Sequence, residues 1–184
     1  MIAADDADKD GGGGGGGGGV GTKRKASDVT ADDCVDGVVE PVTVEAPPPV
    51  IPDVVFVVPY RDRVQQRAFF QRHMMNTVLA DMPEGMHQIW FVHQRDERRF
   101  NRGAIKNIGI RIAQDIYPDH WRNITFVFND IDTAPFTPGF FDYATIHGVA
   151  KHFFGFTFAL GGIVSITGHD FDRVNGFPNL WFWG

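Results

Sequence analysis

The sequence predicts an α/β fold in which a mostly parallel central sheet is flanked by helices. Three apolar, β-branched runs alternate with two stretches whose apolar residues recur at helical spacing. The runs cover residues 54–58, 88–92 and 123–128, and the helical stretches cover 61–79 and 104–116. Continuous apolar runs are typical of strands buried on both faces. A β-α-β-α-β order of such elements predicts parallel strands joined by right-handed crossovers.

The folded part of the chain is predicted to begin near residue 51. Residues 1–50 contain no aromatic residue, so residues 51–184 hold all 17 Phe, 4 Trp and 3 Tyr. The first part also carries a glycine run at 11–19 and three prolines at 47–49. Such a segment buries too little apolar surface to offset a backbone ordering entropy of about 1–2 kcal/mol per residue. We expect a disordered Gly/Pro-rich leader over residues 1–50 and one globular domain over 51–184.

Composition argues against several classes of protein. The net charge of −6 argues against nonspecific nucleic-acid binding, for which the basic triplet at residues 23–25 is the one local signal. Cys34 is the single cysteine, so no intrachain disulfide can form. No apolar run reaches the length of a transmembrane helix, and the amino terminus lacks the order of a signal peptide. These features favour a cytoplasmic protein without a transmembrane segment.

The two predicted helices each have an apolar face. The stretch 61–79 carries Phe69, Phe70, Met74 and Val78 at roughly helical spacing, and it follows Pro59, which is expected to end the first strand. The stretch 104–116 places four isoleucines, at positions 105, 108, 112 and 116, on one stripe. We expect both faces to pack on the sheet.

Two aspartates directly follow the third predicted strand. The run 123–128 leads into Asn129, Asp130, Ile131 and Asp132. Charged side chains at the carboxyl end of a buried parallel strand emerge into a ligand crevice, and carboxylate oxygens suit Mg²⁺ or Mn²⁺. The pair predicts a site for a divalent metal and a diphosphate. Alternatively, Asp130 begins a turn and Asp132 is merely solvated.

The other two strand ends carry cations. Arg61 and Arg63 follow the first strand, and Phe100 and Arg102 follow the second. Guanidinium groups bind phosphate oxygens through planar pairs of donors, and an aromatic ring can pack on a base. Alternatively, the first two arginines pair with nearby aspartates, Asp62 or Asp81, and Phe100 belongs to the core. Because the carboxyl ends of parallel strands share one edge, the three ends together predict a nucleotide diphosphate site.

The carboxyl-terminal block adds a glycine pair and an aromatic cluster. Gly161 and Gly162 suit a close approach of the backbone to a ligand, and the tryptophans near the end suit stacking on a sugar. The alternatives are a bulge at the glycines and a core role for the tryptophans.

These motifs, in this order, resemble the β-1,4-galactosyltransferase family, glycosyltransferase family 7. The resemblance covers residues 54–184 and lies in Pro59-Tyr60-Arg61-Asp62-Arg63, Phe100-Asn101-Arg102 with Asn107 and Gly109, Phe126-Val127-Phe128-Asn129-Asp130-Ile131-Asp132, Gly161-Gly162, and Asn175-Gly176-Phe177-Pro178-Asn179. It implies a GT-A fold, the nucleotide-diphospho-sugar transferase fold. It also implies inverting transfer of a hexose from a UDP-sugar to a sugar hydroxyl, with Mn²⁺ holding the diphosphate.

The resemblance also implies roles for single residues. Donor binding falls to Pro59, Tyr60, Arg61, Arg63, Phe100, Arg102, Asp130, Ile131, Lys151, Gly162 and Trp183. Asp132 is the implied metal ligand, and Trp183 and Gly184 would contact the acceptor, a free sugar or a glycoconjugate. Ala159 stands where the family has a donor-selecting tyrosine, so UDP-N-acetylgalactosamine (UDP-GalNAc) competes with UDP-galactose as the expected donor.

The chain departs from the family at its end. The family continues into a Glu-Asp-Asp segment that provides the general base, whereas this chain stops at Gly184. We therefore expect no catalytic base among its residues and a domain that is incomplete at its carboxyl end. Candidate substitutes are His147, His152, Asp172 and the pair His169 and Asp170, of which the pair is expected to be structural. The alternative to an enzyme is an inactive remnant that binds UDP or a sugar.

Overall fold

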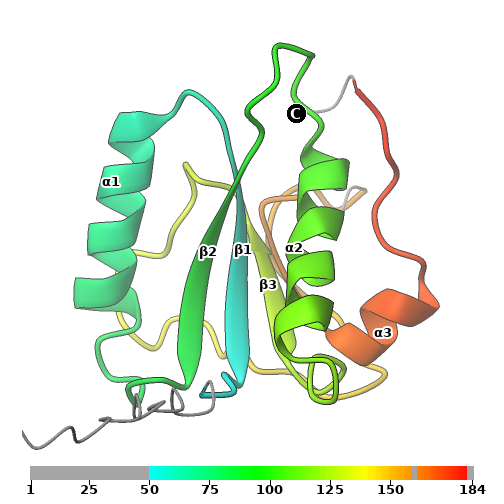
Figure 1. Cartoon of the computed structure of the whole chain (residues 1–184). Helices are drawn as coiled ribbons and strands as arrows, with labels where there is room; N and C mark the ends of the chain where they lie inside the picture. The colour runs from blue at the N-terminus through cyan, green and yellow to red at the C-terminus, as the bar shows by residue number, and fades with distance from the viewer. Residues whose placement is uncertain (1–49, 159–160, 182–184) are drawn as a thin grey trace, which may run out of the picture. The chain divides into compact units, whose positions relative to one another are not determined.

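The structure, a computed structural model, describes residues 50–158 and 161–181. These residues form a five-stranded sheet of strand order β2-β1-β3-β5-β4, with helices on both faces (Figure 1). The elements in chain order are β1 (Val54–Tyr60), α1 (Val64–His73), the π-helical turn η1 (Met74–Val78), β2 (His87–His93), α2 (Arg102–Ile116), β3 (Thr125–Asn129), β4 (Lys151–Phe154), β5 (Ile163–Thr167) and α3 (Gly168–Arg173).

Strand direction in the sheet is mixed. β1 pairs in parallel with β2 and β3, so that Val57 lies opposite both Trp90 and Phe128. β5 is antiparallel to β3 and to β4, which means that β1 to β4 share one direction and β5 is reversed. The predicted fold class, a mostly parallel sheet flanked by helices, is confirmed.

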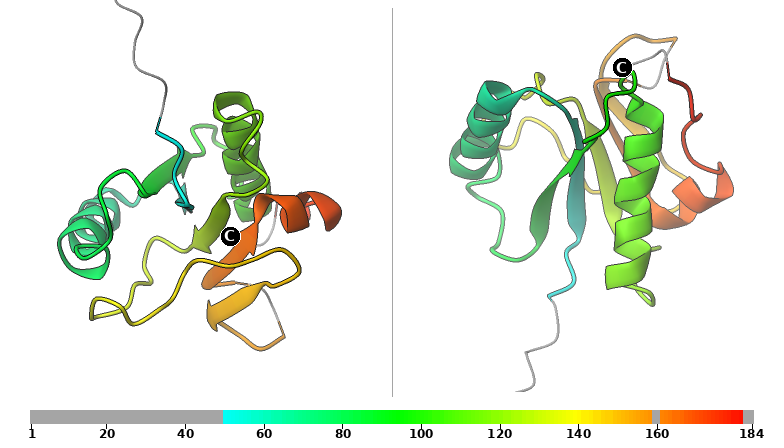
Figure 2. Two further views of the ribbon diagram at one scale, coloured as in Figure 1. Left: turned by 90° about the horizontal axis from the view of Figure 1, so that it is seen from below. Right: turned by 45° about the horizontal axis from the view of Figure 1, so that its top comes forward.

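Alternate residues of β1 face two separate core clusters. Val54, Phe56 and Val58 pack with Phe70 and Met74 on the α1 side. Their neighbours Val55 and Val57 pack on the other side, with α2 and α3. Figures 1 and 2 show α1 across the sheet from α2 and α3. All of β1 is buried because helices cover both of its faces.

The isoleucine stripe on α2 was predicted to face the sheet, and that prediction is wrong for three of its members. Ile108, Ile112 and Ile116 are 49%, 38% and 45% exposed. The buried face of α2 consists of Ile105, Lys106, Gly109, Ile110 and Ala113. A Cβ at Gly109 would lie 2.5 Å from Val57 Cγ1, so the helix packs closely on β1 through small residues. Larger side chains at this contact would hold the helix away from the sheet.

The first helix begins later than the predicted residue 61. Asp62 has a left-handed φ of 53°, and α1 then runs from Val64 to His73. Phe70, Met74 and Val78 are buried as expected, whereas Phe69 is exposed.

Pro59 does not end β1, contrary to expectation. Tyr60 O accepts a hydrogen bond from Gln94 N, so the backbone polar groups of Tyr60 point toward β2. Those of the preceding residue, Pro59, therefore point to the opposite side of the strand. The pairing with β3 stops at Val57, and no partner on that side needs the missing N–H of Pro59.

Several predictions lie outside the described residues. They concern the leader with Cys34, the donor-selecting position Ala159, and Trp183 and Gly184. Within the described ranges, no helix is both long and apolar enough to cross a bilayer.

Candidate functional site: a crevice at the carboxyl ends of β1 and β3

A crevice of about 310 Å³ opens where β1 and β3 end and α2 begins. Its lining residues come from all three predicted strand ends: Pro59, Arg61, Asp62, Arg63, Phe100, Arg102, Asp130, Ile131 and Asp132. Eight of these nine were named in advance as donor or metal residues; Asp62 was expected only as an ion-pair partner. The crevice lies outside the carboxyl ends of the parallel strands, where ligands bind in open α/β sheets.

Asp130 is fixed between α2 and β5. Its Oδ2 lies 3.1 Å from Arg102 Nη1 and accepts a hydrogen bond of 3.3 Å from the Gly162 N–H. In return, the Asp130 N–H donates to Gly162 O at 3.0 Å. These contacts link three segments that are far apart in the sequence. They also hold the guanidinium of Arg102 at the crevice.

Asp132 is much more open than Asp130. Its carboxylate is 57% exposed, and Oδ2 lies 3.9 Å from Nη1 of Arg63, which is itself 55% exposed. An exposed pair at this distance is strongly screened by solvent. Asn129 shapes the turn, because its Nδ2 donates to Asp130 O at 2.8 Å and to Thr133 O at 2.7 Å. Asp130 thus begins a turn, and the turn leaves Asp132 facing solvent.

Arg61 combines an ion pair with an aromatic contact. Its Nε lies 3.6 Å from Asp62 Oδ2, and its guanidinium carbon lies 5.6 Å from the centre of the Phe100 ring. It also donates a hydrogen bond to Arg98 O. The predicted pairing with Asp62 is present, but neither of these arginines pairs with Asp81 among the described residues. Phe100 is partly buried against the α2-side core and also lines the crevice, a position that is compatible with both of its predicted roles.

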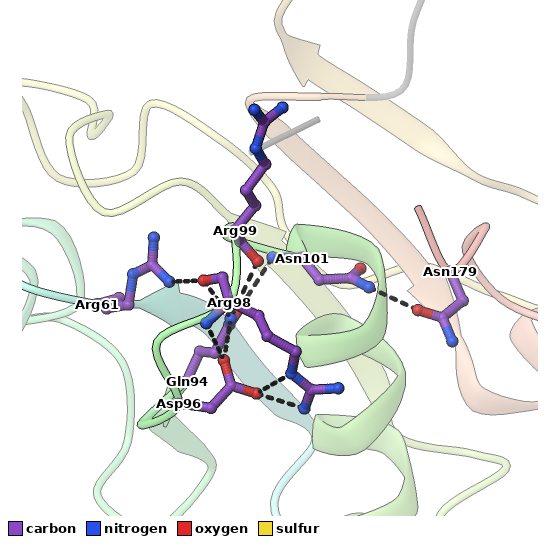
Figure 3. A network of polar contacts seen from close by, with 7 residues as sticks. All are labelled: Arg61, Gln94, Asp96, Arg98, Arg99, Asn101 and Asn179. Atoms are coloured by element: carbon purple, nitrogen blue, oxygen red, sulfur yellow. Dashed lines mark hydrogen bonds and ion pairs between the residues drawn. The ribbon is translucent and has the colours of Figure 1, made fainter. Parts of the chain in front are cut away.

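The side chain of Gln94 forms hydrogen bonds within the loop that leads to Phe100 and Arg102 (Figure 3). Its Nε2 donates to Asp96 Oδ1 at 2.7 Å and to the carbonyl oxygens of Arg98 and Arg99. Its Oε1 accepts from the Asn101 N–H at 2.8 Å. The hydrogen bonds from Gln94, and then from Arg98, hold the pKa of Asp96 below its usual value. These hydrogen bonds of one buried amide tie the loop residues 94–101 together.

Asn101 joins this loop to α2 and to the carboxyl-terminal segment. Its Oδ1 accepts from the Ala104 N–H at 2.9 Å, which caps the amino terminus of α2. Its Nδ2 donates to Asn179 Oδ1 (Figure 3). Asn107 makes two further bonds to this segment, since its side chain donates to Phe177 O and accepts from Phe177 N, both at 2.9 Å. Asparagines of two predicted motifs therefore hold the segment 175–179 against α2.

Some predicted donor residues lie away from the crevice. The Tyr60 ring is buried in the core on the α1 side, next to His93. Lys151 bonds to Asp142, with Nζ 2.9 Å from Oδ2. Gly162 reaches the site only through Asp130. The side chains of Tyr60 and Lys151 therefore lie outside the crevice, which is lined by other residues of the strand ends.

The conformation of Gly162 has an explanation within the fold. Its φ is +75°, and a Cβ there would lie 2.2 Å from Phe154 O. The register between β4 and β5 shifts at this point. This irregularity lies on β4, between His152 and Phe154, so a bulge at the glycines themselves stays a prediction.

Asp170 holds the long loop after β3 onto α3. Its Oδ2 accepts from the Gly148 N–H at 2.6 Å and from Thr167 Oγ1 at 2.9 Å. The bond from Gly148 is the largest cause of a pKa below the usual value for this carboxyl group. His169 lies beside it, with Nδ1 3.2 Å from Oδ1, and stacks on His147. These contacts support the structural role expected for the pair.

Lys106 is a buried charged residue that is not among the site residues predicted from the sequence. This side chain is 2% exposed and lies on the buried face of α2. Burial lowers its pKa to about 8. Gly109 and Ala113, one and two turns further along, are the signal that would have identified this face, since small residues mark a close helix contact.

Asp132 can serve as one ligand of a divalent metal. No three described His, Cys, Asp or Glu residues come together as a metal site. A single open carboxylate fits an ion whose other ligands are diphosphate oxygens and water, as is usual for nucleotide-bound divalent ions. The residues present fit such an ion and do not form a metal cage of their own.

The known proteins that are similar to this chain are named as galactosyltransferases. The family model for the N-terminal region of glycosyl transferase group 7 matches residues 30–138. Xylosylprotein 4-beta-galactosyltransferase of Caenorhabditis elegans is 31% identical over 138 residues, which cover 70% of this chain and 45% of that protein. Beta-1,4-galactosyltransferase 7 of Drosophila melanogaster is 29% identical over 140 residues, which cover 70% and 40% respectively. The chain thus spans less than half the length of these two curated relatives.

Solved structures of the Drosophila enzyme have the same fold over the matched part. Its catalytic domain in complex with xylobiose is 26% identical and has a TM-score of 0.60, with 73% of this chain and 57% of that chain covered. A variant of that enzyme in complex with manganese, UDP-Gal and xylobiose gives a TM-score of 0.61 at 25% identity, with the same coverage.

Proposed function

Because the chain belongs to glycosyltransferase family 7, the family of the β-1,4-galactosyltransferases, we propose that its crevice binds a UDP-sugar with Mn²⁺ for inverting transfer of the sugar to a carbohydrate acceptor. One observation carries the proposal: three arginines and the Asp130–Asp132 pair meet in a single crevice at the carboxyl ends of β1 and β3. UDP-galactose and UDP-GalNAc are the expected donors.

The arginines suit the diphosphate and uridine parts of the donor. Arg61, Arg63 and Arg102 enter the crevice from the ends of β1 and the start of α2, and guanidinium groups bind phosphate oxygens in pairs. Phe100 lies beside Arg61 and offers a ring edge or face to the base. The ion pair with Asp130 orients Arg102 before a ligand arrives, which lowers the entropic cost of binding.

Asp132 would hold the metal on the open side of the crevice. A bound Mn²⁺ supplies Lewis-acid stabilisation of the negative charge that develops on the departing UDP. Arg63 lies 3.9 Å from the same carboxylate and adds a cation at that position. Asp130, held by Arg102 and Gly162, is left to contact the donor.

In inverting transfer an acceptor hydroxyl attacks the anomeric carbon as the bond to UDP breaks, and the hydroxyl proton passes to a base. The described residues of the crevice supply cations for the leaving group. Each carboxylate there has a partner: Asp130 has Arg102, Asp132 has Arg63 and Asp62 has Arg61. No histidine lines the described crevice. We assign Asp130 to the donor and Asp132 to the metal, and we assign the role of the base to none of the described crevice residues.

This observation also favours a second function, which is binding of UDP or a UDP-sugar without transfer. The groups proposed to bind the diphosphate come from this chain, whereas the proposal assigns no described residue to take the proton of the acceptor. The two functions differ in their products and share the same donor crevice.

Calorimetric titration of the chain with UDP and Mn²⁺ tests the donor binding that the two functions share. We expect Mn²⁺-dependent binding to the wild type and a loss of at least about tenfold in affinity, roughly 1.4 kcal/mol, in Asp132→Ala. Asp115→Ala is the matched control, because Asp115 is also exposed and also lies 3.9 Å from an arginine, but on α2. Equal affinity of Asp132→Ala and Asp115→Ala would contradict the metal assignment.

Product analysis separates the two functions. The chain is incubated with UDP-galactose or UDP-GalNAc, Mn²⁺ and xylobiose, the acceptor analogue present in the solved relatives, and products are followed by mass spectrometry. Sugar transfer supports the enzyme. Binding of UDP without transfer supports the binding protein, and no binding of UDP by the wild type rules out both.

A further inference from the structure

We infer that a second cavity, between α2, β5 and residues 174–180, binds a small amphipathic carboxylate whose charged group contacts Lys106. The cavity adjoins the donor crevice through Arg102, which lines both. The inference does not rest on the proposed function, because its central side chain is Lys106, which does not line the donor crevice, and its ligand is different.

The cavity has the size and composition of a small-molecule site. Its volume is about 690 Å³, within the range of roughly 300–1,000 Å³ that is usual for ligand pockets. Its wall is mainly apolar and includes Phe128, Val164, Ile166, Phe171, Phe177 and Leu180. A hydrocarbon chain would bury its surface against this wall.

Lys106 is the fully buried charged group in this apolar wall, whereas Arg102 at the edge is partly exposed. The Lys106 side chain is 2% exposed, and Nζ lies 4.8 Å from the centre of the Phe177 ring and 5.8 Å from that of Phe128. Nζ makes no hydrogen bond or ion pair with any residue of 50–158 or 161–181. The two rings offer weak cation–π attraction, which does not replace the lost hydration of a buried ammonium group. A buried cation without a partner, facing a cavity, marks the place where an anion would bind.

The charges around Lys106 favour an anion with a single charge. Burial is the largest cause that lowers its pKa to about 8, while Asp130 acts to raise it and Arg102 to lower it. Asp130 is already paired with Arg102, so the group of three carries one excess positive charge at pH 7. A carboxylate would neutralise this excess. An uncharged alcohol of the same length would fill the cavity and leave the charge unpaired.

Octanoate and octan-1-ol are the paired probes for this site. In calorimetric titrations of the full chain at pH 7, we expect saturable binding of octanoate at one site, at least tenfold tighter than binding of octanol. In Lys106→Met, which keeps an unbranched apolar side chain, the preference for octanoate should be lost. Arg111→Met, an exposed position on α2, serves as the control and should keep it.

The pH dependence of octanoate binding gives an independent check on the role of Lys106. Octanoate affinity should fall as the pH rises above about 8, where Lys106 loses its charge, whereas octanol affinity should not change. Thermal denaturation of Lys106→Met verifies that the variant is folded. Equal binding of octanoate by wild type and Lys106→Met would overturn the inference. Absence of saturable octanoate binding would also overturn it.

Discussion

Arg102 and Asp130 join the start of α2 to the end of β3 through a contact of 3.1 Å between Nη1 and Oδ2. The same carboxylate oxygen accepts the N–H of Gly162, next to the start of β5. One side chain therefore holds together the helix start and the two strands that border the crevice.

Arg102→Ala should weaken UDP binding by about tenfold to a hundredfold, because it removes a phosphate-binding cation and releases Asp130. Its effect on the free energy of unfolding should stay within about 1 kcal/mol, since the pair is partly exposed. Arg122→Ala is the control, because Arg122 also lies 3.1 Å from an aspartate, Asp172, but outside the crevice. Titration calorimetry measures both variants. Equal UDP affinity of the two would remove Arg102 from the donor site.

Lys106→Met should raise the free energy of unfolding at pH 7 by about 1–3 kcal/mol, because it removes an unpaired buried charge. The folded-state pKa of Lys106 is about 8, below the usual 10.5. Below pH 8 Lys106 is protonated in both the folded and the unfolded chain, so the free-energy cost of burying its charge is constant. Between pH 8 and 10.5 the unfolded chain keeps a proton that the folded chain has lost, so wild-type stability should rise relative to the variant.

Urea denaturation of both proteins between pH 7 and 10.5 measures this difference. The difference between wild type and Lys106→Met should shrink with increasing pH. A variant that is less stable at pH 7, or a gap that does not depend on pH, would show that the ammonium is well compensated in the folded protein.

Tyr143→Phe should leave the free energy of unfolding unchanged or raise it by about 1 kcal/mol. The Tyr143 hydroxyl is buried without a hydrogen-bond partner in the described part of the chain, and burial raises its pKa well above the usual value. The ring contact with Phe56, at 4.9 Å between centres, is kept in the variant. Removing an unsatisfied buried hydroxyl removes its desolvation cost.

Tyr117→Phe provides the contrast in the same denaturation experiment. Tyr117 is equally buried, but its hydroxyl accepts a hydrogen bond of 3.0 Å from Gln88 Nε2. We expect this variant to lose about 1 kcal/mol. If the two variants lost the same stability, the Tyr143 hydroxyl would have a partner after all.

Gly109→Ala should destabilise the protein by about 1–3 kcal/mol, although alanine favours helices. The new Cβ would lie 2.5 Å from Val57 Cγ1, and Val57 is fully buried in β1. Gly161→Ala should be nearly neutral, because a Cβ there has no described atom within 4 Å. Thermal denaturation followed by circular dichroism compares them. A neutral Gly109→Ala would mean that α2 can move away from the sheet at little cost.

The motifs at the strand ends were sufficient to predict the family, which the family model and the relatives confirm. They also placed Arg61, Arg63 and Asp132 at one edge of the sheet. The reason is geometric: in a parallel sheet all carboxyl strand ends lie at the same edge, so order along the chain already determines which loops meet. The individual roles proposed for these residues stay predictions.

Periodicity could not determine which face of α2 is buried. The isoleucines at 108, 112 and 116 satisfy the helical repeat as well as the true buried face does. The choice depends on how closely the helix approaches β1, and that is decided by the contact between Gly109 and Val57.

The sequence by itself determined the succession of strands and helices and the cations and carboxylates that end at one edge of the sheet, because local apolar patterns and chain order are sufficient for both. Only the tertiary structure decided that Asp130 is held by Arg102 and Gly162 while Asp132 stays open, and that Lys106 is buried with no ionic partner among the described residues. Those properties depend on contacts between segments distant in the chain. Pairing, desolvation and close packing are set by neighbours in space, which the local pattern of residues does not specify.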